Sequence, residues 1–217
     1  LSFAPPHGAT MATVAEPRMI DTALVPRFVS VPISKLRARY YGEGHHADDV
    51  GSVRTDSPIP AGWPLYYFEI KVTDSGTSGE ITIGLCRPTF QLNHQPGTDA
   101  VSYGFRGDTG RVYHGDADGV SVGVRFGDGD VVGCGHDMVS GDVFFTVNGA
   151  IIATPFRQVS GPLFPVVGMH SQGEEVELVL RPHVRTVPFR FDVEAHRRSL
   201  VSAWRSSLLR QRVPSVC

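Results

Sequence analysis

The sequence has few cysteines and no long apolar run. Its three cysteines among 217 residues show no paired spacing, so neither a disulfide framework nor a cysteine-rich zinc site is expected. Cys86 and Cys134 fall within apparent strands, and we interpret them as buried thiols of a protein in a reducing compartment. No run approaches the roughly 18 apolar residues of a membrane-spanning helix, and the N-terminus has no signal pattern. We therefore expect a soluble protein of the cytoplasm, the nucleus or both.

The sequence also lacks a strong excess of charge and a complete catalytic motif. Its net charge of −2 gives no basic face of the kind that binds nucleic acid. The run 76–79 (GTSG) has the wrong spacing for the nucleophile motif G-x-S-x-G. His45, His46, Asp48 and Asp49 share one glycine-flanked loop, which is more typical of a solvated loop than of a metal site. The sequence thus predicts no catalytic residues, no cofactor and no metal ion.

What the sequence has in plenty is short segments of alternating polarity separated by turn residues. Its 24 glycines and 16 prolines are typical of many short strands joined by turns. Residues 66–72 (YYFEIKV) alternate as a half-buried strand would, with Tyr67 and Glu69 on the solvent side. Asn148-Gly149 predicts a type I′ hairpin turn, because both central positions of that turn need positive φ. About ten such segments predict an all-β fold, an antiparallel sandwich of two sheets.

The two ends of the chain differ from this pattern. Residues 1–27 carry Pro, Ala, Thr and Gly without a sustained period, which predicts a disordered leader. Residues 28–187 are expected to form the sandwich domain, and residues 188–217 a helical extension. Its helix is predicted from Asp192, an N-cap, to about Arg210, where apolar residues recur near the helical period. The helix either packs back on the sandwich or is offered to a partner.

Several motifs in the strand-rich part carry a resemblance to a known family. They include residues 66–69 (YYFE), 83–85 (IGL), 102–105 (SYGF), 145–149 (FTVNG) and 163–168 (LFPVVG). In this order they resemble the SPRY (B30.2) domain, and specifically its RanBPM-like subgroup, the Ran-binding-protein-type scaffolds of CTLH ubiquitin ligase complexes. The resemblance implies a bent two-sheet sandwich of the concanavalin-like jelly-roll type, followed by a C-terminal helix.

The resemblance also implies where such a domain binds. Loops at one end of the sandwich would take a short peptide segment of a partner, and they match residues 42–49, 74–79, 87–98 and 169–173. They would form a shallow platform of amide, hydroxyl and aromatic groups with little net charge. The implied peptide-binding residues are Asp49, Thr77, Ser78, Asn93, His94, Gln95, Tyr103, Phe105, Met169, His170 and Gln172.

One of these loops departs from the subgroup. Residues 94–98 (HQPGT) stand where the subgroup tends to carry Arg-Leu-Pro-Gly-Trp, so a basic and an aromatic anchor are missing. Replacing Asn93 and Gln95 together by alanine is still expected to weaken peptide binding, and to spare the fold because both lie in a loop.

The resemblance therefore implies a non-catalytic protein-interaction module that scaffolds or recruits substrates for a ubiquitin ligase assembly. Its expected partner is a protein, with CTLH complex subunits among the candidates, and neither nucleic acid nor a membrane. A lectin-like carbohydrate-binding sandwich is the alternative, since fold alone does not fix function. A glycan array with and without calcium would separate the two. An enzyme of unrecognised type would instead need a pocket of convergent titratable groups.

Overall fold

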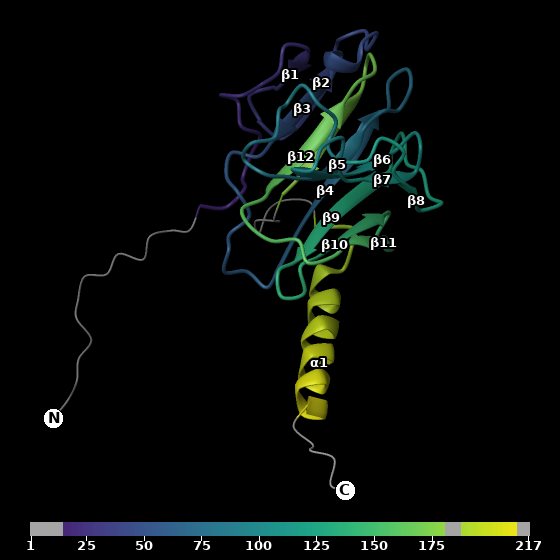
Figure 1. Ribbon diagram of the computed structural model, residues 1–217. Coiled ribbons are helices and arrows are strands. Elements are labelled where there is room, and N and C mark those ends of the chain that lie inside the picture. The colour runs from purple at the N-terminus through teal and green to yellow at the C-terminus, as the bar shows by residue number, and fades with distance from the viewer. Residues whose placement is uncertain (1–14, 181–187, 212–217) are drawn as a thin grey trace, which may run out of the picture.

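Two antiparallel sheets pack face to face in the computed structural model, which describes residues 15–180 and 188–211 (Figure 1). The first sheet has the strand order β1 (Val29–Ser30), β2 (Arg37–Tyr40), β13 (Glu175–Val179), β4 (Leu65–Asp74), β9 (Val131–Asp137), β10 (Asp142–Val147) and β11 (Ala150–Phe156). The second has the order β3 (Gly51–Arg54), β12 (Phe164–Met169), β5 (Thr82–Cys86), β6 (Ser102–Arg106), β7 (Arg111–Tyr113) and β8 (Val120–Ser121). A 3₁₀ helix, η1 (Ala47–Asp49), precedes β3, and helix α1 (Val193–Gln211) follows the sheets. The predicted sandwich with a C-terminal helix is confirmed.

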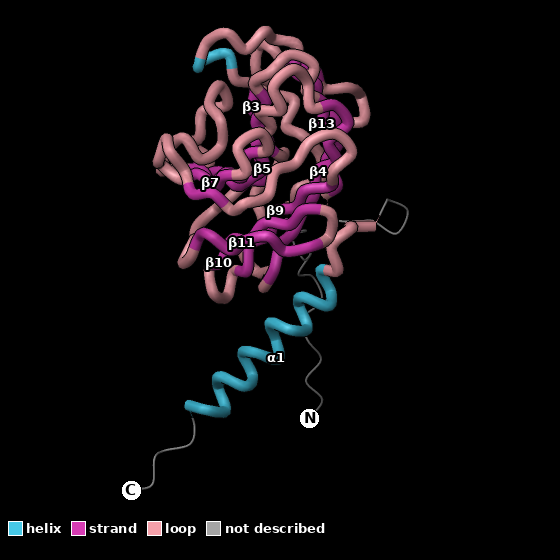
Figure 2. The backbone as a smooth tube through the Cα atoms, turned by 90° about the vertical axis from the view of Figure 1, so that its right-hand side faces the viewer, coloured by secondary structure: helices cyan, strands magenta, loops and turns pink. Residues whose placement is uncertain are grey.

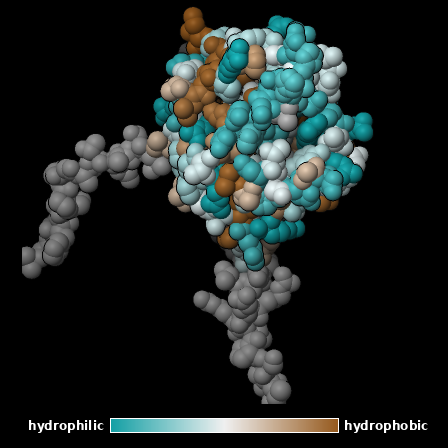
Figure 3. Space-filling model, turned by 45° about the horizontal axis from the view of Figure 1, so that its top comes forward, coloured by the Kyte–Doolittle hydropathy of each residue, from teal (hydrophilic) through white to brown (hydrophobic). Residues whose placement is uncertain are grey.

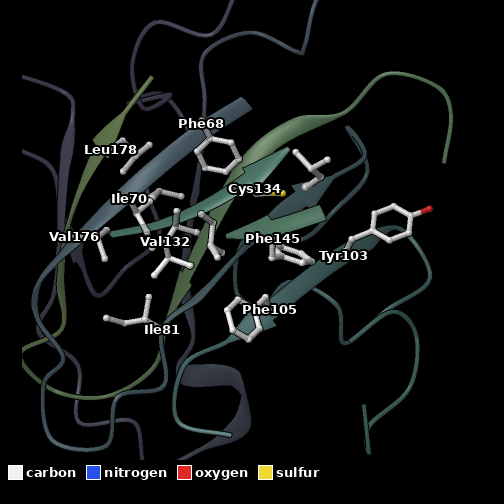
Figure 4. Packing of buried hydrophobic residues seen from close by; sticks show 14 of the residues in the cluster. Phe68, Ile70, Ile81, Tyr103, Phe105, Val132, Cys134, Phe145, Val176 and Leu178 are labelled. Carbon is white, nitrogen blue, oxygen red and sulfur yellow. The ribbon is translucent and has the colours of Figure 1, made fainter. Parts of the chain in front are cut away.

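The core lies between the two sheets and is made of alternate side chains of their strands (Figure 4). Phe68 and Phe145 come from the first sheet and Phe105 from the second, and all three are fully buried. The rings of Phe105 and Phe145 have centroids 5.5 Å apart. Burial of this apolar surface is the main stabilising contribution to a fold of this kind.

The two cysteines within strands are buried and free, as predicted. Burial raises the pKa of the Cys86 thiol to about 12 and raises that of Cys134 as well. Both thiols therefore stay protonated and unreactive, and they act as small apolar core groups. Cys217 lies outside the described residues.

The hairpin turn between β10 and β11 is confirmed. Asn148 has a φ of 51° and Gly149 a φ of 84°, so both central residues adopt the left-handed conformation. Val147 pairs with Ala150 across the turn. The Asn148 side chain is also engaged, since its amide nitrogen donates to the Asp130 carboxylate at 2.7 Å.

Strand β4 is buried on both faces over most of its length, so the predicted half-buried strand is wrong. Tyr67 and Glu69, expected on the solvent side, are only 4% and 2% exposed. Phe189 and Phe191 cover them: the ring of Tyr67 lies 5.1 Å, centroid to centroid, from each of these two rings. The segment after the sandwich thus forms a second small core on the outside of the first sheet.

Residues 15–27 of the predicted leader belong to the fold. Ile20 is 1% exposed and belongs to the main core. Its amide donates to the Lys35 carbonyl at 2.8 Å, and it forms an isolated bridge with Thr55. The prediction of disorder is therefore wrong for residues 15–27, and residues 1–14 lie outside the described part of the chain.

Helix α1 begins as predicted and then leaves the sandwich. The Asp192 carboxylate accepts a hydrogen bond from the Ala195 amide at 2.8 Å, which makes Asp192 the N-cap. Val193 and Leu200 pack against the outer core, so the first two turns lie on the sandwich. Figures 1 and 2 show the rest of α1 extending away from the sheets. Within the described residues, no helix is long and apolar enough to cross a membrane.

Candidate functional site

Three loops from distant parts of the sequence form a pocket of about 310 Å³ at one end of the sandwich. They connect β2 to β3, β4 to β5 and β12 to β13. This end lies opposite α1 in Figure 1, and Figure 3 turns it toward the viewer as a mostly hydrophilic surface with an apolar band along one side. The pocket is lined by Glu43, Gly44, His45, Thr77, Ser78, Glu80, His170, Ser171 and Gln172.

The loop between β2 and β3 forms one wall of the pocket, and we call its residues 43–49 the wall loop. It is held by several contacts. Gly44 has a φ of 69°, and a Cβ there would lie 1.9 Å from the His170 carbonyl oxygen, so only glycine fits this approach. At the other end of the loop, the Tyr40 hydroxyl donates to the Asp49 carbonyl. The His46 amide donates to the Asp49 carboxylate at 3.1 Å. These contacts place the loop across the end of the sheets.

The other two loops are hydrogen-bonded to each other. The amide and the hydroxyl of Thr77 both donate to the Gln172 carbonyl at 3.1 Å. The Ser78 amide donates to the Ser171 hydroxyl, also at 3.1 Å. The β4–β5 and β12–β13 loops therefore form one unit, and the exposed side chains of Thr77, Ser78 and Gln172 stand on its surface.

A charged group of side chains lies at the centre of the pocket. His170 Nδ1 is 2.9 Å from Glu80 Oε2, and His170 Nε2 is 2.9 Å from the His46 carbonyl oxygen. The Arg106 guanidinium donates to the same Glu80 oxygen at 3.1 Å. The pocket thus carries more charge than the predicted platform of amide, hydroxyl and aromatic groups.

A buried carboxyl group lies beneath this centre. Glu174 is fully buried and accepts hydrogen bonds from the His170 amide at 2.6 Å, the Ser171 amide at 3.0 Å and the Ser171 hydroxyl at 2.9 Å. Burial raises the pKa of Glu174 to about 7, the three donors oppose this rise, and the charge of Glu80 adds to it. A buried carboxyl group in contact with the pocket-lining residues His170 and Ser171 therefore has a pKa raised to about 7.

Five of the predicted site residues come together in or beside the pocket. Thr77, Ser78, His170 and Gln172 line it. Asp49 lies in the wall loop, with its side chain turned to the His46 amide. Whether these residues bind a peptide stays a prediction.

The long loop between β5 and β6 supports the pocket from behind. The Gln95 side chain is 6% exposed, and its amide nitrogen donates to the Glu80 carbonyl at 2.8 Å. Asn93 is exposed, and the carbonyl of the half-buried His94 accepts from the Ser52 hydroxyl at 2.6 Å. The prediction that Gln95 can be replaced without harm to the fold is therefore wrong, because alanine would leave a void and an unpaired carbonyl.

Three predicted site residues lie in the interior. Phe105 and Met169 are fully buried, so their side chains present nothing to a partner. Tyr103 is 6% exposed and stacks on His114, with ring centroids 4.1 Å apart. The aromatic part of the predicted platform is therefore not at the surface, because strand alternation turns Phe105, and with it Met169, toward the core.

Sequence reasoning missed Glu80 and Glu174 as site residues. Glu80 follows a turn and Glu174 precedes a strand, so each had the pattern of an ordinary solvated carboxylate. The position of Glu174 could have indicated a site residue, because it directly follows Gly173 in a loop that the resemblance assigned to the binding end. Within residues 15–180 and 188–211, no group of three or more His, Cys, Asp and Glu side chains is placed to hold a metal ion.

A larger groove of about 760 Å³ lies on the outside of the first sheet. It runs between the start of β4 and the segment that leads into α1. Trp63, Leu65 and Tyr67 line one side, and Phe189 and Phe191 the other. The groove lies where the C-terminal segment packs on β4, and none of the predicted binding loops lines it.

Comparisons with known proteins agree with this fold. The SPRY domain family model matches residues 65–182. The Ran-binding proteins 9/10 homolog of Drosophila melanogaster is 36% identical over 178 residues, which cover 82% of this chain and 18% of that protein. The Ran-binding protein M homolog of Arabidopsis thaliana is 38% identical over 172 residues, or 79% of this chain and 36% of that protein. The chain therefore spans little more than a third of these relatives at most.

A solved structure, that of a human SPRY domain, matches 73% of this chain and 98% of its own with a TM-score of 0.64 and 34% identity. A second, the SPRY domain of human HERC1, matches with a TM-score of 0.59 at 20% identity and so supports the fold alone. The matched family model covers more than half of the chain, from β4 to beyond β13. The protein belongs to the SPRY domain family.

Proposed function

We propose that this chain is a non-catalytic module that binds a short peptide segment of a partner protein in the pocket at the end of the sandwich. The peptide would lie over the joined β4–β5 and β12–β13 loops, against the wall loop between β2 and β3. In this proposal Thr77, Ser78 and Gln172 supply hydrogen bonds to the peptide, and Asn93 and His94 lie farther along its path.

One observation carries the proposal: loops far apart in sequence meet in a pocket that holds exposed hydroxyl and amide groups. Such groups suit an extended peptide, whose backbone needs donors and acceptors. The loops are fixed by contacts within the domain, such as those of Thr77 to Gln172, so little order has to be gained on binding. Membership of the SPRY family and the relation to Ran-binding proteins support a protein as the partner.

We further propose that the module scaffolds or recruits substrates for a ubiquitin ligase assembly of the CTLH type. This finer role rests on the resemblance to the RanBPM-like subgroup and on the relatives named above. Those relatives are much longer than this chain, so the assembly would engage parts of a longer protein together with this domain.

The experiment that tests the binding site uses a peptide library displayed on phage and selected on the wild-type domain. Selected peptides are then titrated by calorimetry against the wild type and the double variant Ser78→Ala/Gln172→Ala. We expect the double variant to bind about 5- to 150-fold more weakly, because two hydrogen-bonding side chains are removed, worth about 1–3 kcal/mol together.

The control is Ser160→Ala, an exposed serine on the β11–β12 loop. That loop precedes β12 and so lies at the other end of the strand from the pocket. Ser160→Ala is expected to bind as the wild type does. Equal affinities for all three proteins would move the site to another face, and a library that yields no binder would contradict the peptide-binding role itself.

A further inference from the structure

His170 lies between two hydrogen-bond acceptors. Its Nδ1 faces the Glu80 carboxylate and its Nε2 faces the His46 carbonyl, each at 2.9 Å. A neutral imidazole has one N–H and one lone pair, so it can donate to only one of these groups and would turn its lone pair toward the other. Only the imidazolium form, with two N–H groups, can donate to both acceptors. The geometry therefore favours a protonated His170.

The charged and titratable groups around His170 mostly favour the protonated form. On the β4–β5 loop Glu80 contacts the ring, and beneath it Glu174 accepts from the His170 amide. The wall loop contributes Glu43 and His45, which pair with each other at 3.2 Å, and His46 and Asp49. Tyr40 of β2 stays protonated, since burial raises its pKa to about 12. From β6, Arg106 opposes the charge of His170, but it also pairs with Asp108.

These surroundings raise the pKa of His170 above its usual value of 6.5. Burial lowers the pKa, and the hydrogen bonds to Glu80 and to the His46 carbonyl, with the charges of Glu80 and Glu174, outweigh burial. Because the folded-state pKa is raised, the stabilisation is fully present below about pH 6.5. It is lost as pH rises through the raised value.

We propose that protonated His170 is a pH-sensitive clip that holds the wall loop, residues 43–49, against the pocket, and that deprotonation releases this loop. The clip joins the β12–β13 loop to the wall loop through the His46 carbonyl, which also accepts from the Asp49 amide at 2.9 Å. When the ring loses one proton, one of its two contacts turns repulsive. Glu80 bears a charge and holds the remaining N–H more strongly, so the contact to His46 is the one that breaks.

The consequence for binding rests on the function proposed above, since the wall loop is part of the pocket. A peptide that fits the closed pocket would bind more tightly at pH 6 than at pH 8. The release of the loop is itself independent of any ligand. It can therefore be measured on the free domain, and the hypothesis of the His170 clip can be tested separately from the hypothesis of peptide binding.

The first measurement is nitrogen-15 NMR of the His170 ring in the wild type across pH 5.5–9. We expect both ring nitrogens to carry protons at pH 6 and the ring to titrate above its ordinary value. A ring that is neutral at pH 6 overturns the proposal. This measurement needs no variant, so a variant that fails to fold would not affect it.

The second measurement is amide hydrogen exchange of the wall loop, expressed as protection factors to correct for the intrinsic effect of pH. In the wild type, protection of the His46 and Asp49 amides is expected to fall about 10- to 100-fold between pH 6 and pH 8, the range for loss of a charged hydrogen bond. In His170→Gln it should be low at both pH values. The matched control is His45→Gln, an exposed histidine of the same loop, which should behave as the wild type does.

Equal protection at pH 6 and pH 8 in the wild type would overturn the clip, and so would a wild-type pH response in His170→Gln. If the loop responds as expected but the selected peptides bind equally at both pH values, the clip stands and the peptide does not contact the wall loop. If the peptides bind elsewhere altogether, only the proposed function fails.

Discussion

The carboxylate of Glu69 joins the sandwich to the segment that follows it. Its oxygens accept hydrogen bonds from the Tyr67 hydroxyl at 2.9 Å, the Arg190 amide at 2.9 Å and the Phe191 amide at 3.0 Å. Burial raises the pKa of Tyr67, so its hydroxyl stays protonated and keeps donating. A buried carboxylate is tolerated here because three donors point at it.

We expect Glu69→Gln to lower the free energy of unfolding by about 1–3 kcal/mol. The substitution keeps the shape of the side chain but places an N–H₂ group where an oxygen now accepts, so donor would face donor. Chemical denaturation monitored by tryptophan fluorescence measures the change. The control is Glu177→Gln on the neighbouring β13, whose carboxylate pairs with Arg37 at the surface and should cost less than about 1 kcal/mol. An equal effect of the two substitutions would contradict the role given to Glu69.

Among the elements, the β10–β11 hairpin depends on a glycine at position 149. Gly149→Val would place a β-branched residue at a φ of 84° and a Cβ 2.8 Å from the Arg190 carbonyl oxygen. We expect a loss of about 1–3 kcal/mol of stability from the backbone strain. The control is Gly62→Val, because a Cβ at Gly62 meets no atom within 4 Å. Unchanged thermal stability of Gly149→Val would argue against this turn.

The strands could be predicted from the sequence because their signals are local. The alternation of residues 66–72 and the pair Asn148-Gly149 each act over a few positions, and the structure has a strand at the first and a tight turn at the second. The burial of Glu69 could not be predicted in this way, since its partner Arg190 lies 121 positions along the chain. A solvated strand face and a face covered by a distant segment have the same pattern of residues.

At the scale of the whole molecule, the site also has a part that could be predicted from the sequence and a part that could not. The resemblance placed the binding loops at one end of the sandwich, and three of the four loops line the pocket. The choice of individual residues was less successful, because Phe105, Met169 and Gln95 belong to the interior. Glu80 and His170 lie 90 positions apart in the sequence, so the spacing of residues within either loop could not predict their contact.

The C-terminal segment gives the whole molecule its second core, which predicts different outcomes for two truncations. Removing residues 188–217 takes away Phe189 and Phe191 and leaves Tyr67 and the rest of the outer face of β4 exposed. Burial of Phe191 is worth about 1.5–3 kcal/mol and the partly buried Phe189 adds less, so the melting temperature should fall, and the exposed patch should increase aggregation. Removing only residues 204–217 retains Val193 and Leu200 on the sandwich and should leave both properties unchanged. Differential scanning calorimetry and light scattering on the two truncated proteins measure these effects. If the longer truncation melts and scatters as the full chain does, the segment contributes nothing to the fold and is free to serve a partner along its whole length.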